Sequence, residues 1–169
     1  MTGLYVASGT EANTGGRILE RHIETALKAY GFETFDYSDS ADNLDMFAAR
    51  RLVRNVPYFP NIFGGMSRSE FVIEDDHQRR RIRVECRWQQ SGGSTDEKLV
   101  ALLLNAAEAM PENEVIIVVD GNGAREACVD WIKNAAISRK YQTRPKTIRV
   151  MSMAEFSMWA REFARGRAS

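Results

Sequence analysis

The side chains most suited to chemistry lie in two short runs, Arg68–Glu74 and Arg81–Trp88, in which charged and apolar residues alternate. The polar sequence DDHQRR joins the two runs, so we expect an antiparallel hairpin. A pairing register that is symmetric about this turn sets Glu70 directly opposite Glu85. Opposed residues have Cβ atoms roughly 5 Å apart, and two carboxylates at that separation need a cation or a shared proton. An all-oxygen pair of this kind suits Mg²⁺ or Mn²⁺ better than zinc.

A solvated polar face is the alternative explanation for the same pattern. Side chains alternate across a strand, so one face of the second run is apolar and carries Ile82, Val84, Cys86 and Trp88. The opposite face is charged and carries Arg81, Arg83, Glu85 and Arg87, followed by Gln89 if the strand extends. The same register pairs Glu74 with Arg81, and neighbouring arginines can neutralise Glu85 in the same way. Charged outward faces are common on antiparallel sheets, so the spacing alone leaves both explanations open.

Three further polar residues have both a functional and a structural interpretation. Lys98 lies in the first turn of an expected helix, where the helix dipole disfavours a cation by roughly 0.3–1 kcal/mol. It is either a functional amine or a surface lysine paired with Glu97 or Asp96. Asp120 begins the sequence DGNG after an apolar run, which favours a turn or a helix cap over a catalytic role. His22 lies on an apolar helical stripe and is expected to be a packed core residue rather than a ligand.

The elements that position these residues follow from hydrophobic periodicity and from glycine and proline breakers. Helices are expected at Gly16–Tyr30, Ser94–Met110, 123–139 and 154–164, and strands at Glu33–Tyr37, at the two runs of the hairpin, at Glu114–Asp120 and at Thr147–Met151. Ser94 and Glu97 have the spacing of a capping box. Residues 43–55 are compatible with a helix, and 56–65, with two prolines, with an ordered loop. This order predicts an α/β fold whose mixed sheet has helices on both faces.

Composition narrows the class of protein. The 169 residues suit one domain spanning 1–169, with residues 1–14 and 166–169 expected to be flexible. The formal net charge is zero, so a nucleic acid would have to be held by a local basic patch. Cys86 and Cys128 give no disulfide framework and two histidines give no zinc spacing, which favours a reducing cytoplasm. Neither a basic leader nor an apolar run of 18 residues is present, so we expect no signal peptide and no membrane partner.

The order of elements and two short motifs resemble the PD-(D/E)XK nuclease superfamily, which has the restriction-endonuclease-like fold. Its half-motifs look like SEF, with Glu70 in the acidic position, and ECR, with Glu85 and Arg87 in the E-x-K positions. The stretch RWQQSGGSTDEK also looks like small phage- and prophage-type members, in which a glutamine follows E-x-K. Glu20 matches an acidic position that many members carry on the first helix. The resemblance covers roughly Gly16 to Val119.

The resemblance implies an αβββαβ core with an added C-terminal αβα, and a metal-dependent DNA endonuclease in a bacterial or phage-infected cell. Mg²⁺ or Mn²⁺ would be held by Glu20, Glu70 and Glu85, with no organic cofactor. Catalysis would involve Glu70, Glu85, Arg87, Gln89 and Lys98, the glutamine orienting the attacking water. Arginine in the lysine position is a departure, because a guanidinium stabilises charge on phosphate but accepts no proton. Either the metal activates the water, or another amine such as Lys98 takes that role.

The same resemblance favours DNA as the partner. Contacts to DNA are then expected from Arg50, Arg51, Arg54, Tyr58, Arg81 and Arg83, the arginines to phosphates and the ring to a base step. An ordinary surface balanced by nearby acidic residues is the alternative. Cutting both strands of a duplex requires two sites, which predicts a homodimer. Two other functions stay open: a degenerate nuclease fold that only binds DNA or a partner protein, and a Toprim-like site built on Asp120.

Overall fold

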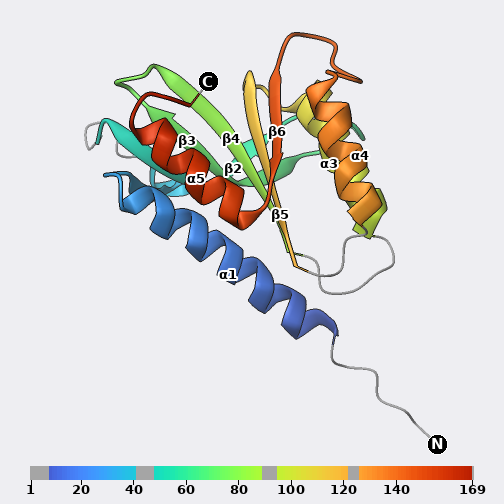
Figure 1. The fold of residues 1–169 in the computed structure, drawn as a ribbon, viewed down its shortest axis with the longest axis horizontal. Coiled ribbons are helices and arrows are strands. Elements are labelled where there is room, and N and C mark those ends of the chain that lie inside the picture. The colour runs from blue at the N-terminus through green and yellow to red at the C-terminus, as the bar shows by residue number, and fades with distance from the viewer. Residues whose placement is uncertain (1–7, 41–47, 89–94, 122–125, 169) are drawn as a thin grey trace, which may run out of the picture.

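The computed structural model describes residues 8–40, 48–88, 95–121 and 126–168, and within these ranges it forms one mixed sheet with helices on both faces (Figure 1). In chain order the elements are α1 (Ser8–Lys28), β1 (Glu33–Asp36), α2 (Tyr37–Ser40), β2 (Arg50–Tyr58), β3 (Ser67–Asp75), β4 (Arg80–Trp88), α3 (Thr95–Leu104), the π-helical turn η1 (Asn105–Ala109), β5 (Glu114–Asp120), α4 (Glu126–Ile137), β6 (Thr147–Met151) and α5 (Met153–Ala164). The α/β class predicted from the sequence is confirmed.

The six strands lie in sequence order across the sheet. Strands β2, β3 and β4 form an antiparallel meander, and β5 and β6 continue from β4 in parallel. Strand β1 pairs in parallel with the outer side of β2. The meander, the crossover through α3 and the return to β5 make up the αβββαβ arrangement, with β1 added at its edge.

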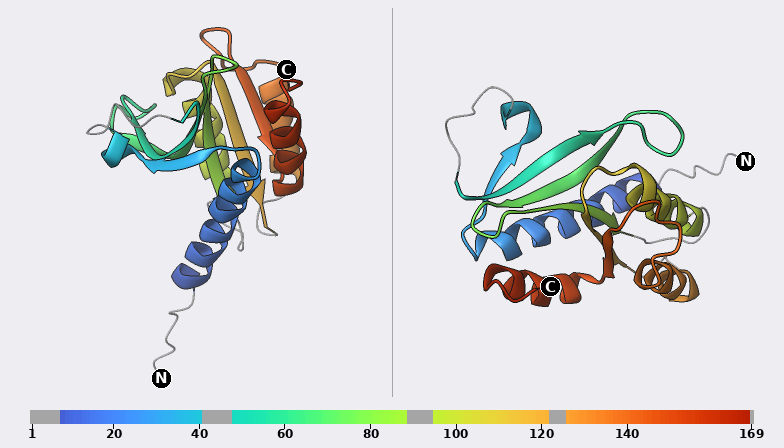
Figure 2. Two further views of the ribbon diagram at one scale, coloured as in Figure 1. Left: turned by 90° about the vertical axis from the view of Figure 1, so that its left-hand side faces the viewer. Right: turned by 90° about the horizontal axis from the view of Figure 1, so that it is seen from above.

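Two hydrophobic layers hold the sheet between its helices. Helices α1 and α5 cover one face (Figure 2). They pack on the inward side chains of the meander, such as Phe71, Ile82 and Val84. Helices α3 and α4 cover the other face over β5 and β6. Strand β5 is covered on both sides, with Val115 to Val118 fully buried, as its uninterrupted apolar sequence predicts. No helix in the described residues is long and apolar enough to cross a membrane.

The helix expected over residues 43–55 is wrong where the structure describes it, whereas the ordered loop expected over 56–65 is confirmed for residues 59–65. Residues 43–47 lie outside the described residues, and Arg50–Tyr58 form a strand that pairs with β1 and β3. The cause is an interruption of the alternation at Asn55, whose φ is +56°. Leu52 faces the α1 layer, whereas Val53 and Val56 pack together on the opposite face. An apolar spacing of three in place of two imitates a helix.

Helix α1 begins at Ser8, earlier than Gly16, so residues 8–14 are helical rather than flexible. Two glycines in a helix normally destabilise it, but Gly15 has a packing role. A Cβ atom on Gly15 would lie 1.9 Å from the ring of Trp88, which packs against the α1 layer at the end of β4. The close approach of helix and indole ring therefore requires glycine at this position.

Candidate active site

The two glutamates singled out by the sequence converge on one guanidinium. Arg87 Nη1 donates to Glu70 Oε1 at 2.9 Å, and Nη2 of the same side chain donates to Glu85 Oε2 at 3.0 Å. The antiparallel register is as predicted where it is formed, with Glu74 paired to Arg81. That pairing ends at Phe71 and Val84, and beyond it the Cys86 N–H donates to Glu70 Oε2 at 3.0 Å. The Glu70 carboxylate therefore accepts a hydrogen bond from the backbone of β4 beyond the end of the strand pairing, and this bond holds it beside Glu85.

Glu85 occupies a largely dry position, with 1% of its surface exposed. Its Oε1 accepts a hydrogen bond from Ser69 Oγ, which itself accepts one from Arg83 Nη1 at 3.0 Å. Burial and then the nearby charge of Glu70 raise the pKa of Glu85 to about 8, against the opposing effects of Arg87 and Ser69. Without a divalent ion this environment therefore favours the protonated form of the carboxyl group.

Glu20 approaches the same region from helix α1. Its Oε2 accepts a hydrogen bond from Arg54 Nη2 at 2.8 Å, and Arg54 also pairs with Glu24. Burial raises the pKa of Glu20, Arg54 lowers it, and the charge of Glu70 raises it again. Glu20 and Glu70 thus interact electrostatically, but the nearest cation to Glu20 is an arginine from β2.

A cavity of about 300 Å³ opens beside this cluster. Its lining includes Glu85 and Arg87 from β4 and Lys98 from the first turn of α3, and is completed by Tyr58, Ser67, Arg68, Ala101, Leu102 and Asn105. Lys98 is exposed and makes no ion pair with any side chain in the described ranges. Gln89 and Ser94 lie outside the described residues, so the expected water contact and capping box stay predictions. The cavity therefore brings Glu85 and Arg87 together with the Lys98 amine of α3.

Several arginines expected to contact DNA are engaged in ion pairs on the sheet. Arg50 pairs with Asp75, Arg51 with Glu74 and Asp76, Arg54 with Glu20 and Glu24, and Arg81 with Glu74 and Glu112. Each keeps its charge but shares it with a carboxylate, so the basic patch is locally compensated. This is the balanced surface that the sequence left open.

Arg83 and Tyr58 are buried, which does not fit the expected contact to DNA phosphates and bases. Arg83 is 1% exposed, and its guanidinium lies over the ring of Tyr58 at 5.2 Å from the ring centroid. A side chain enclosed in this way cannot reach a phosphate. Tyr58 is 7% exposed and has its remaining surface on the cavity, so it shapes the cavity wall.

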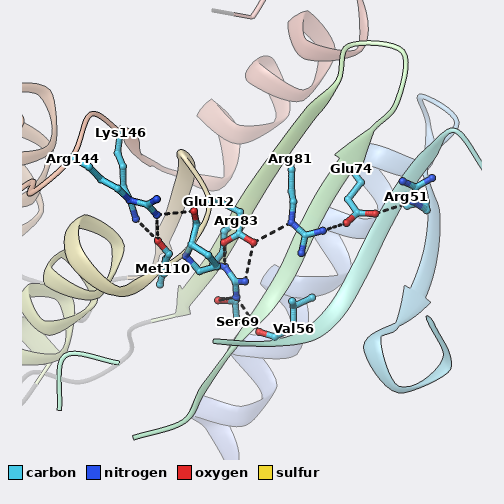
Figure 3. A network of polar contacts seen from close by, with 11 residues as sticks. Arg51, Val56, Ser69, Glu74, Arg81, Arg83, Met110, Glu112, Arg144 and Lys146 are labelled. Atoms are coloured by element: carbon cyan, nitrogen blue, oxygen red, sulfur yellow. Dashed lines mark hydrogen bonds and ion pairs between the residues drawn. The ribbon is translucent and has the colours of Figure 1, made fainter. Parts of the chain in front are cut away.

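A buried ion pair between Arg83 and Glu112, which the sequence did not indicate, lies next to the site (Figure 3). Arg83 donates to Glu112 through Nε and through Nη2, the latter at 2.9 Å, and to the Val56 carbonyl at 3.0 Å. The Glu112 side chain is 2% exposed. Burial raises the pKa of Glu112, but its arginine partners, Arg83 above all, outweigh that effect and lower the pKa. Because Arg83 also donates to Ser69, this pair fixes the hydroxyl that holds Glu85.

Asp120 and His22 have structural roles. Asp120 accepts the Gly121 N–H at 2.8 Å and, through its other oxygen, the Met153 N–H at 3.0 Å at the start of α5. His22 Nε2 lies 2.6 Å from Ser157 Oγ, which joins α1 to α5. Asp120 agrees with the turn interpretation, whereas His22 is half-buried and hydrogen-bonded between two helices rather than packed in the core.

The sequence profile described as a PD-(D/E)XK nuclease superfamily domain matches residues 11–164. The chain belongs to the PD-(D/E)XK nuclease superfamily. The match spans all three glutamates and both sides of the cavity, and the mixed sheet with flanking helices is consistent with the restriction-endonuclease-like fold. Comparisons with curated proteins and with solved structures gave no match.

The donor chemistry of Glu70 and Glu85 fits a divalent cation of the kind that PD-(D/E)XK nucleases generally use. Mg²⁺ is commonly held by one or two carboxylates and keeps several waters. Within the described ranges no group of three or more His, Cys, Asp or Glu side chains is arranged around a common point. The buried Glu85 and the partly exposed Glu70 nevertheless have the repulsion that a cation relieves, as the raised pKa of Glu85 indicates.

Proposed function

We propose that this chain is a metal-dependent endonuclease that hydrolyses phosphodiester bonds in DNA. The observation that carries the proposal is the convergence of Glu70 and Glu85 on Arg87 beside an open cavity, in a chain of the PD-(D/E)XK superfamily. Nuclease-type activity follows from the family. We infer the divalent metal from the two glutamate side chains, and DNA as the substrate and endonucleolytic cleavage from the positions of the motif residues.

Glu70 and Glu85 would hold Mg²⁺ or Mn²⁺, with Glu20 contributing directly or through water. A bound ion supplies polarisation of the scissile phosphate and lowers the pKa of a bound water. Ser69 and Cys86 contribute by fixing the two carboxylates: one donates a side-chain hydroxyl and the other a backbone N–H. The chain therefore presents both carboxylates in a fixed orientation, and Arg87 is the side chain that would have to withdraw for an ion to bind.

Arg87 and Lys98 supply positive charge on the cavity side. The Arg87 side chain is 31% exposed, and in the absence of a divalent ion it pairs with both glutamate side chains. With an ion present, its guanidinium is free to stabilise charge that builds on a phosphate in the transition state. Arg87 accepts no proton, so a proton-accepting amine in the cavity would be Lys98. We assign Gln89 to orienting the nucleophile.

A binding function without cleavage is the second candidate, and one specific observation favours it. Arg87 satisfies both carboxylates at once, so the cluster is complete without a metal. A protein of this fold that had lost cleavage would still keep the cavity and its positive side chains. Cleavage of both strands by the active form predicts a homodimer, whereas the binding form carries no such requirement.

Supercoiled plasmid incubated with the purified protein separates the two candidates. We expect nicked and linear DNA in the presence of Mg²⁺ or Mn²⁺ and none in EDTA. Glu85→Gln and Glu70→Gln should abolish cleavage, while Asp130→Asn, at an exposed position on α4, should leave it unchanged. No cleavage by the unaltered protein with either metal over a range of salt excludes the enzyme. Cleavage that survives Glu85→Gln places the active site elsewhere.

A further inference from the structure

The connection between β2 and β3, residues 59–66, exposes an apolar surface beside the cavity. We call it the β2–β3 loop. Phe59 is 66% exposed, Phe63 81% and Met66 63%. The loop projects past the end of the meander on the side of α3 (Figure 2). Large apolar side chains with this exposure cost solvation free energy unless they meet a partner.

The loop is held in place by hydrogen bonds. Asn61 Oδ1 accepts from the N–H groups of Phe63 at 2.9 Å and Gly65 at 3.0 Å, and Asn61 Nδ2 donates to Ser67 Oγ at 2.8 Å. Two backbone bonds, Asn61 N to Gly65 O and Gly64 N to Asn61 O, close the turn. The exposed rings are thus presented from an ordered turn, which lowers the entropy cost of binding through them.

The same loop is fastened to the wall of the candidate active site. Ile62 N donates to Asn105 Oδ1 at 3.0 Å, and Asn105 Nδ2 donates to the Ala101 carbonyl in α3 at 3.0 Å. Asn105 lines the cavity that contains Glu85, as do Tyr58 and Arg68 on either side of the loop. The loop that carries the exposed rings is therefore hydrogen-bonded to a residue that lines the cavity of the candidate catalytic carboxylate.

The charge of the segment favours a polyanion over other occupants. Between Pro57 and Arg68 the sequence contains no acidic residue, and its one charged side chain is Arg68. Arg68 is exposed and lies on the cavity. An arginine in the same segment as exposed aromatic rings combines a phosphate contact with surfaces on which nucleobases stack.

We propose that the β2–β3 loop is a base-stacking wedge, with Phe63 inserted against nucleobases of DNA whose phosphate backbone enters the adjacent cavity. This inference rests on the proposed function, because the cavity must first hold DNA. It adds that the preferred substrate is a duplex that is locally unstacked or kinked next to the scissile phosphate, as at a mismatch, a bulge or a strand junction. Apolar side chains inserted between base steps kink DNA in this way, and their contact is tolerant of sequence.

A set of 30-base-pair duplexes, each with one 2-aminopurine, tests the wedge in Ca²⁺ buffer, where binding is read by fluorescence without relying on cleavage. We expect the protein to raise 2-aminopurine emission at one or two positions and to bind a bulged duplex more tightly than a perfect one. Phe63→Ala should remove the fluorescence change and weaken binding of the bulged duplex about 10-fold, whereas Phe63→Trp should keep both. Ile137→Ala, an 80% exposed apolar position on α4, is the matched control and should change neither.

The outcomes separate the wedge from the proposed function. Binding and cleavage that are unchanged by Phe63→Ala, with no rise in emission, overturn the wedge and leave the nuclease intact. Failure of the unaltered protein to bind any duplex or to cut plasmid overturns both. A dimer in sedimentation that becomes a monomer on Phe63→Ala, with DNA binding unchanged, assigns the loop to a protein interface and also overturns the wedge.

Discussion

Proton release on metal binding follows directly from the environment of Glu85. Burial and the adjacent Glu70 raise the pKa of this carboxyl to about 8, so in the metal-free protein its protonated form is favoured at pH 7 and its ionised form at pH 9. A divalent ion binds the deprotonated form. Binding should therefore release up to about one proton per ion at pH 7 and fewer at pH 9, and below pH 7 the apparent Kd should rise by up to about tenfold for each pH unit.

Titration calorimetry with Mg²⁺ in two buffers of different ionisation enthalpy measures this proton release. Glu85→Gln is the control, because it keeps the shape of the side chain and removes the titrating group; weak binding without coupled proton release is expected. Release that does not fall between pH 7 and pH 9, or that persists in Glu85→Gln, refutes the assignment of the proton to Glu85.

The same raised pKa makes the stability of the metal-free protein fall as the pH rises. The folded state holds a proton on Glu85 in a pH range where the unfolded chain, with an ordinary carboxyl, has lost it. The contribution of this group is therefore fully present below the ordinary pKa of 4.5, and the free energy of unfolding falls as pH rises from there through about 8. Urea unfolding of Glu85→Gln should lack this component of the pH dependence.

Five further substitutions, at four positions, test the packing and the chemistry. Glu112→Gln leaves its arginine partner buried without a counter-charge and should lower the free energy of unfolding by about 3–5 kcal/mol in urea, more than any exposed glutamate. Gly15→Ala should cost about 1–3 kcal/mol because the new Cβ meets Trp88, whereas Gly16→Ala, which meets nothing within 4 Å, should stabilise α1 by about 0.5–1 kcal/mol; equal effects contradict the packing. Lys98→Ala should slow plasmid cleavage about 10²-fold without changing Tm, and recovery in Lys98→Arg would exclude a proton-accepting role.

The arrangement of helices and strands was predictable wherever one periodicity ran without interruption. Strand β5 was recognisable from EVIIVVD, and the β3–β4 hairpin from two alternating runs around a polar turn. Strand β2 was not, since Asn55 interrupts its alternation and brings Val53 and Val56 to the same face. A sequence pattern reports the spacing of apolar residues, and a left-handed residue inside a strand changes that spacing.

The two acidic residues of the candidate site could be located from the sequence, but the residues that hold them in place could not. Glu70 and Glu85 were located from alternation and register, and Arg87 from its place two residues after Glu85. Ser69 and Glu112 carried no signal, because their role depends on contacts between distant segments: Glu112 precedes β5 and meets Arg83 in β4. Arg83 was expected to be a surface cation for the same reason, because the carboxylate with which it forms a buried ion pair, Glu112, is distant in sequence.

Manganese soaked into crystals of the protein, located by its anomalous scattering, measures the central claim most directly. The account predicts one strong peak bound by carboxylate oxygens of both Glu70 and Glu85, with the Arg87 guanidinium withdrawn from at least one of them. A difference map in which Arg87 still bridges the two glutamates at high manganese concentration, with no peak between them, contradicts it.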